Sequence, residues 1–105
     1  MLYLYIHIYG KVHKTGLRYF LKQKASQLNI SGCVFYRDDH SVNVIAQGES
    51  SEIDKFVKHC KDGNVDSIIE KIIVKQCPGQ VFNSFEVVDD RSTMLDLNNA
   101  NENNR

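Results

Sequence analysis

The chain has 105 residues, enough for one domain with a modest core and too few for two. Its 13 lysines and arginines balance its 13 aspartates and glutamates, so no sustained positive field attracts nucleic acid or an anionic membrane surface. The three cysteines are odd in number, lie far apart and form no metal-binding pattern, which predicts a reducing, cytoplasmic location.

The first predicted element is a strand from Leu2 to Tyr9. Aliphatic residues alternate there with tyrosine and histidine, and this period of two is typical of a half-buried strand. The segment is short and has neither a basic flank nor a small-residue cleavage site. We therefore expect neither a signal peptide nor a membrane span.

A basic turn and a helix follow this strand. Gly10 and Gly16 punctuate the segment up to Leu17, which is typical of a turn that leads into a helix. From about Arg18 to Leu28 the apolar residues recur at helical spacing, and they form one stripe: Leu17, Leu21, Ala25 and Leu28.

The middle of the chain predicts a hairpin and a second helix. Two β-type runs, Cys33 to Tyr36 and Val42 to Ala46, are joined by a polar tract of five residues. The second helix begins near Ser51 and ends at the segment Asp62-Gly63-Asn64.

The remaining elements are strands and a tail. A β-branched run from Ser67 to Val74 predicts a strand, Cys77-Pro78-Gly79 a turn, and Phe82 to Val88 a short last strand. From Asp89 onward the sequence is polar and asparagine-rich, so we expect a tail with little apolar surface to bury. A short helix could still dock through Met94, Leu95 and Leu97.

The order of elements is β-α-β-β-α-β with a short last strand. This order predicts an α+β, ferredoxin-like split β-α-β sandwich, in which two helices cover one face of an antiparallel sheet. We expect one domain over residues 1–88 and a tail over residues 89–105.

The turn between the first strand and the first helix is the best candidate for a binding site. A glycine-bearing loop there can present backbone N–H groups, and the helix N-terminus adds positive potential for a phosphate or carboxylate. Arg18 would add a fork of permanently charged donors that matches phosphate oxygens. Many such turns carry glycine and a basic residue for solubility alone, so the loop by itself does not decide between the two interpretations.

The same loop resembles the acylphosphatase signature, Gly-x-Val-(Gln/His)-Gly-Val-x-(Phe/Tyr)-Arg. Gly10, Val12, His13 and Arg18 match it by position, and Leu17 replaces the aromatic residue. The resemblance runs from about Leu2 to Val88 through three further segments: Ser31-Gly32-Cys33-Val34 after Leu28, Ala46-Gln47-Gly48-Glu49, and Phe82-Asn83-Ser84-Phe85-Glu86-Val87.

This resemblance implies the hydrolysis of acyl phosphates without a cofactor or metal ion. In such a reaction the protein holds the phosphoryl group, offsets its charge and orients water. Carried over by position, Arg18 binds phosphate, and the loop amides complete the site: His13, Lys14, Thr15, Gly16 and Leu17. The implied partners are a small acyl phosphate or inorganic phosphate, with neither nucleic acid nor membrane, and the chain is expected to be a monomer.

Two departures from the family pattern bear on the chemistry. Tyr36 takes the place of the family's water-positioning asparagine, and its hydroxyl lies several ångströms further from the backbone than an amide would. Lys14 replaces a loop glycine. A positive φ there would cost on the order of 1 kcal/mol or make the loop relax into another shape, while the added cation would favour anions.

We expect activity to be weakened or lost because of these two residues. The alternative function is a non-catalytic module that binds phosphate, carboxylate or a partner protein on the same fold. A third is a purely structural domain that makes contact through the tyrosine-bearing face of its sheet. Nucleotide stacking on that face is disfavoured because the RNP-type pattern is missing. A metal site at Asp38, Asp39 and His40 is disfavoured because adjacent hairpin residues diverge.

Overall fold

The computed structural model describes residues 1–79 and 82–88, and these hold the seven elements predicted from the sequence. The predicted tail from residue 89, with its docking residues Met94, Leu95 and Leu97, lies outside the described residues. The last strand is shorter than predicted, and the other boundaries move by a few residues. The elements are β1 Leu2–Lys11, α1 Leu17–Gln27, β2 Ser31–Tyr36, β3 Val42–Gly48, α2 Ser50–Asp62, β4 Ile68–Gln76 and β5 Phe85–Val88.

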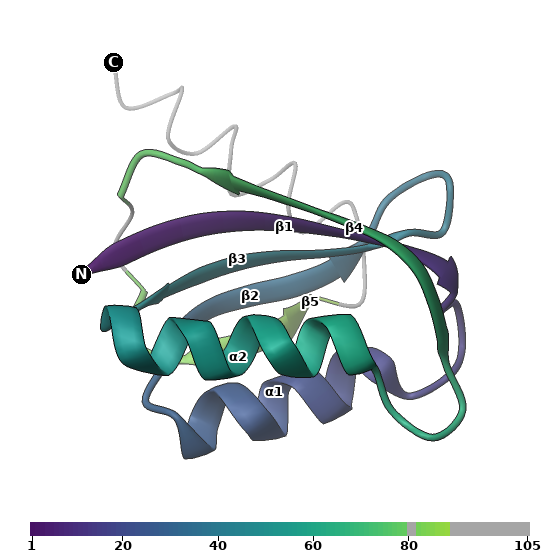
Figure 1. Cartoon of the computed structure of the whole chain (residues 1–105), viewed down its shortest axis with the longest axis horizontal. Helices are drawn as coiled ribbons and strands as arrows, with labels where there is room; N and C mark the ends of the chain where they lie inside the picture. Colours follow the sequence, from purple (N-terminus) through teal and green to yellow (C-terminus); the bar gives the residue numbers. More distant parts are fainter. Residues whose placement is uncertain (80–81, 89–105) are drawn as a thin grey trace.

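The strands form one sheet in the order β4-β1-β3-β2-β5, and both helices lie on the same side of it (Figure 1). Strands β1 to β4 pair antiparallel, as the split β-α-β arrangement requires. Strand β5 adds to the edge parallel to β2, so the complete sheet is mixed rather than antiparallel throughout. The ferredoxin-like α+β fold is therefore confirmed.

The core lies between the sheet and the two helices. In β1 the aliphatic residues of the alternating pattern, Leu4, Ile6 and Ile8, face the helices and are buried. Helix α1 contributes Leu17, Leu21 and Ala25 from its predicted stripe, and α2 contributes Ile53, Phe56 and Cys60. Burial of these side chains supplies the main stabilising free energy of a domain of this size.

The other face of β1 carries a row of aromatic side chains. Tyr5 and His7 stack with ring centres 4.3 Å apart, and the rings of His7 and Tyr9 lie nearly parallel with centres 6.3 Å apart. Tyr5 also meets Phe35 of β2 edge-on at 6.4 Å. Burial and the positive charges of Arg37 and Lys75 lower the pKa of His7, so its ring is neutral at neutral pH. The aromatic side chains on this face of the sheet therefore pack against one another.

Cys33 and Cys60 pack as small apolar groups, as predicted, whereas Cys77 is only partly buried. Cys60 belongs to the core, Cys33 is buried, and all three thiols are free. Burial raises the pKa of the Cys33 thiol to about 11, so it stays protonated. In the described part of the chain no helix is long and apolar enough to cross a membrane.

Gly10 lies at an irregularity in the pairing of β1 with β4, shortly before β1 ends at Lys11 and the candidate loop begins. The register between β1 and β4 shifts at Tyr9 and Gly10, and Gly10 has φ of 140°. A Cβ atom there would overlap the carbonyl oxygen of Ile68 and lie 2.8 Å from the amide nitrogen of Glu70. Only glycine lets β4 approach this closely, and the resulting bulge sets the direction in which the loop departs.

We expect Gly10→Ala to destabilise the fold, because the added methyl group meets backbone atoms of β4 that cannot turn aside. The loss in free energy of unfolding should be about 1 to 3 kcal/mol, the usual cost of a strained backbone position. Urea denaturation followed by circular dichroism measures it, with Lys11→Ala at the exposed neighbouring position as the control. Equal stability of the two variants would contradict the close approach at Gly10.

Candidate functional site

The loop between β1 and α1 reverses the chain between two buried residues. Val12 and Leu17 are 1% and 0% exposed, so both ends of the loop are fixed in the core. Between them Lys14 and Gly16 have φ of 59° and 79°, the left-handed region that most side chains avoid. Left-handed positions of this kind are typical of loops whose amides form anion-binding concavities, and the N-terminus of α1 follows directly.

Lys14 keeps the left-handed backbone that its position in the loop requires. Of the two outcomes expected from the sequence, the positive φ is the one observed, and Lys14 bears its cost, on the order of 1 kcal/mol. The side chain is exposed, and its ammonium group adds positive charge beside the loop.

Two side-chain hydrogen bonds hold the loop in place. The Thr15 hydroxyl donates to the carbonyl of Val12 at 2.7 Å, and the Asn64 side-chain amide donates to the carbonyl of Thr15 at 2.8 Å. Asn64 follows α2 and lies 49 residues from Thr15 in the chain, so the sequence analysis identified it only as part of a helix end. No local pattern could have revealed this contact, which depends on how α2 packs beside α1.

Arg18 lies in the first turn of α1, beside the end of β2. Its guanidinium carbon is 4.2 Å from the centre of the Tyr36 ring, a distance at which a cation is attracted to an aromatic face. The guanidinium also reaches the carbonyl of Val88 in β5, at 3.4 Å. The structure therefore brings together Arg18 and Tyr36, the two residues that the sequence analysis singled out as decisive.

Tyr36 is the last residue of β2, and its side chain reaches the loop. The phenolic oxygen accepts a hydrogen bond from the amide N–H of Lys14, with a nitrogen-to-oxygen distance of 2.7 Å. The sequence analysis considered Tyr36 only as a replacement for a water-positioning residue. It did not foresee that the hydroxyl would contact the loop itself.

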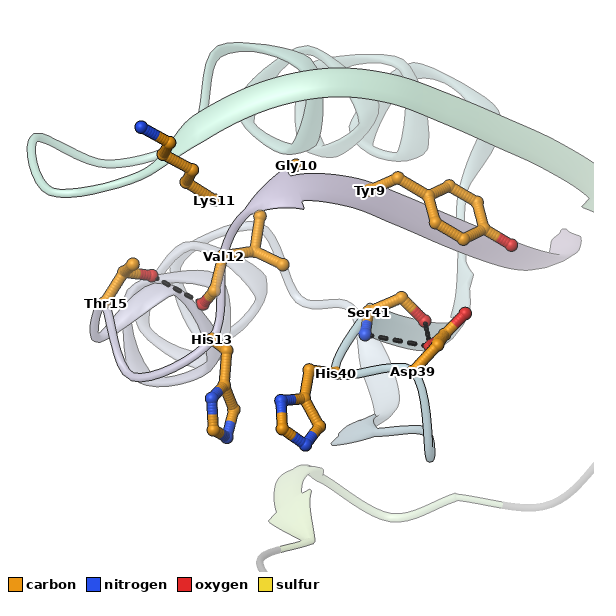
Figure 2. A pocket seen from close by; sticks show the side chains of 9 residues that line it. All are labelled: Tyr9, Gly10, Lys11, Val12, His13, Thr15, Asp39, His40 and Ser41. Atoms are coloured by element: carbon orange, nitrogen blue, oxygen red, sulfur yellow. Dashed lines mark hydrogen bonds between the residues drawn. The ribbon is translucent and has the colours of Figure 1, made fainter.

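His13 and His40 form a stacked pair at the outer side of the loop. Their ring centres are 4.0 Å apart, and Figure 2 shows the two rings facing each other, one from the loop and one from the turn between β2 and β3. They line a pocket of about 280 Å³ that also includes Thr15 and Ser41. Partial desolvation and the adjacent positive groups, chiefly His40 and then Lys14, lower the pKa of His13.

The turn between β2 and β3 is held by its own hydrogen bonds. The Asp39 carboxylate accepts from the amide of Ser41 at 2.9 Å and from its hydroxyl at 2.6 Å (Figure 2), and these bonds lower the pKa of Asp39. Within residues 1–79 and 82–88, no three histidine, cysteine, aspartate or glutamate side chains gather closely enough to hold a metal ion. Asp39 therefore has a structural role in the turn.

Comparison with known proteins gives a consistent result. The acylphosphatase family model matches residues 4–87. The acylphosphatase of Archaeoglobus fulgidus is 34% identical over 87 residues, which cover 83% of this chain and 98% of that protein. The acylphosphatase of Helicobacter hepaticus is 36% identical over 87 residues, covering 77% and 91%. The crystal structure of acylphosphatase from Bacillus subtilis superposes with a TM-score of 0.80 at 30% identity, covering 84% and 99%.

The left-handed backbone at Lys14 predicts the effect of two substitutions there. Lys14→Gly and Lys14→Ala remove the same ammonium group, but only alanine keeps a Cβ atom. We expect the glycine variant to be more stable than the alanine variant by about 1 kcal/mol, measured as the free energy of unfolding in urea. If alanine proves at least as stable as glycine, the loop does not hold the backbone conformation described here.

Proposed function

This chain belongs to the acylphosphatase family, and from that premise we propose that it hydrolyses acyl phosphates at the loop between β1 and α1. Water attacks the phosphorus atom, the bond from phosphorus to the acyl oxygen breaks, and the products are a carboxylate and inorganic phosphate. One observation carries the proposal: the amide of Lys14, the guanidinium of Arg18 and the hydroxyl of Tyr36 converge at this loop.

We assign the phosphoryl group to the segment from His13 to Arg18. The left-handed positions Lys14 and Gly16 support this assignment, since they turn the chain immediately before the N-terminus of α1. Arg18 adds a permanent positive charge, and its planar group can donate to two phosphate oxygens at once. These groups hold the phosphoryl group and offset the charge that builds up as the acyl oxygen leaves.

We infer that the reaction is slower than in a relative that has asparagine at position 36. A short side-chain amide can donate and accept at the end of β2, whereas the Tyr36 hydroxyl is already in contact with the loop at 2.7 Å. Removing one group that orients a reactant commonly costs about 100- to 1000-fold in rate. Acyl phosphates are reactive, so turnover that depends on Arg18 and the loop amides remains measurable.

The second candidate function is a binding module without hydrolysis. The hydrogen bond from Lys14 to Tyr36 favours it, because a phenolic hydroxyl stands there in place of the amide that would orient water. Such a module would recognise a phosphate or carboxylate through the same loop and Arg18.

We place this function in the cytoplasm, in a monomer that acts on small molecules. The three free cysteines are compatible with a reducing compartment. The zero net charge gives no reason to expect nucleic acid as a partner. Neither a metal ion nor an organic cofactor is needed for the reaction as proposed.

The test of the proposed function is hydrolysis of benzoyl phosphate by the wild type and by Arg18→Ala. We expect turnover above the uncatalysed background, reduced by Arg18→Ala about 100- to 1000-fold or to background, because the phosphoryl charge loses its main partner. Loss of the aromatic band of the substrate at neutral pH measures the rate.

Arg37→Ala provides the matched control. It removes the same charge from an exposed arginine that interacts with Tyr5 and His7 on the other face of the sheet. We expect it to keep wild-type turnover. Absence of turnover in the wild type, with inorganic phosphate still binding, would rule out the enzyme and favour the binding module.

Tyr36→Asn should increase turnover of benzoyl phosphate, because it supplies a short amide where the tyrosine ring now lies. An increase of up to about 100-fold is expected, by analogy with the loss when a single orienting donor is removed. The same assay measures it, and the gain should disappear in the double variant with Arg18→Ala. If Tyr36→Asn matches the wild type, position 36 does not limit the reaction.

A further inference from the structure

The hydroxyl of Tyr36 lies where a ligand oxygen would be expected on the loop. Lys14 and Tyr36 are 22 residues apart, and the hydrogen bond between them joins the loop to the end of β2. Its length of 2.7 Å is at the short end of the range for an amide N–H and an oxygen acceptor. The amide N–H of Lys14 can donate one hydrogen bond, and in this structure the Tyr36 hydroxyl accepts it.

Two further contacts keep the tyrosine ring in this position, one from the first turn of α1 and one from the loop. The guanidinium carbon of Arg18 is 4.2 Å from the ring centre. The ring of His13 meets it edge-on, with centres 4.7 Å apart and planes at 67°. The ring of Tyr36 is therefore packed among the same residues that the proposed function assigns to phosphate binding.

A phosphate ion and the Tyr36 hydroxyl compete for the same hydrogen bond from the Lys14 amide. Phosphate binds a loop of this kind through several amides at once, so loss of the Lys14 amide weakens the whole site. For phosphate to use that amide, the hydroxyl must first move away. The measured affinity is then the intrinsic affinity multiplied by the fraction of molecules in which the hydroxyl has moved.

We propose that Tyr36 is an internal competitor for the phosphate site, a residue that sets its affinity by occupying one of its donors. The proposal rests on the proposed function in one respect, that phosphate binds at this loop. It differs from the inference that a water-orienting group is missing, because it concerns binding of the phosphate group and not the rate of attack by water.

An opposite role for the same hydroxyl is chemically possible, and it makes an opposite prediction. The phenolic oxygen accepts from Lys14 while its own proton stays available, so it would extend the site by donating to a ligand placed further out. Competition is favoured because the phenolic oxygen lies directly on the loop amide, where a ligand makes its closest contact. Removing the hydroxyl alone distinguishes the two roles.

Tyr36→Phe removes the hydroxyl and keeps the ring, so the contacts with Arg18 and His13 can persist. We expect it to bind inorganic phosphate about three- to tenfold more tightly than the wild type, the equivalent of one hydrogen bond that no longer competes. Titration with inorganic phosphate, followed by nitrogen-15 NMR of the amides of Lys14 to Arg18, gives the dissociation constants. The Lys14 amide proton should also shift upfield in the free variant, since its acceptor is gone.

Tyr3→Phe is the matched control, because it removes a phenolic hydroxyl near the opposite end of β1. It should bind phosphate as the wild type does. Equal or weaker binding by Tyr36→Phe overturns the competition, and weaker binding assigns the hydroxyl to the ligand as a donor. No phosphate binding by either the wild type or Tyr36→Phe also overturns it, because the loop would then be no phosphate site even without the hydroxyl.

Failure of the proposed function gives a different result. If Tyr36→Phe binds phosphate more tightly but neither protein hydrolyses benzoyl phosphate, hydrolysis is refuted and the competition stands. If the wild type hydrolyses benzoyl phosphate in a manner that depends on Arg18, while Tyr36→Phe and the wild type bind phosphate equally, hydrolysis stands and the competition is refuted.

Discussion

The site depends on one constraint: the chain must reverse between Val12 and Leu17, which are both fixed in the core. Four residues make this reversal, and two of them take the left-handed backbone that permits so tight a turn. Gly10 directs the chain into the loop through its bulge against β4, and Asn64 holds the loop from the end of α2. The position of the loop thus follows from its contacts with the core, with β4 and with the residue Asn64 after α2.

The same constraint explains how the side chain of Tyr36 comes to contact the loop. Strand β2 ends beside the loop, so a side chain at its last residue points toward the amide of Lys14 and the guanidinium of Arg18. A short side chain there would leave room for water and ligand. A tyrosine is long enough to reach the loop, and its hydroxyl has the chemistry of a ligand oxygen. In the proposed site, tyrosine at position 36 therefore leaves fewer loop donors for an anion than a short side chain would.

Positive charge gathers around this loop although the chain as a whole is neutral. Arg18 and Lys14 supply the basic side chains at this loop. Partial desolvation, and then the neighbouring His40 and Lys14, lower the pKa of His13, which stacks on His40. This local positive charge is what the proposed phosphate site requires, although the chain as a whole carries no net charge.

The sequence by itself determined the order of elements, the core stripes of β1 and α1, and the family, because periodicity and short motifs are local properties of the chain. It also identified Arg18, Tyr36 and Lys14 as the informative positions. Only the tertiary structure decided that β5 pairs parallel to β2 and that Asn64 holds the loop. It also decided that the Tyr36 hydroxyl accepts a hydrogen bond from the Lys14 amide. These contacts join residues 22 or more positions apart, and their geometry is fixed by how the helices pack on the sheet, which no local pattern encodes.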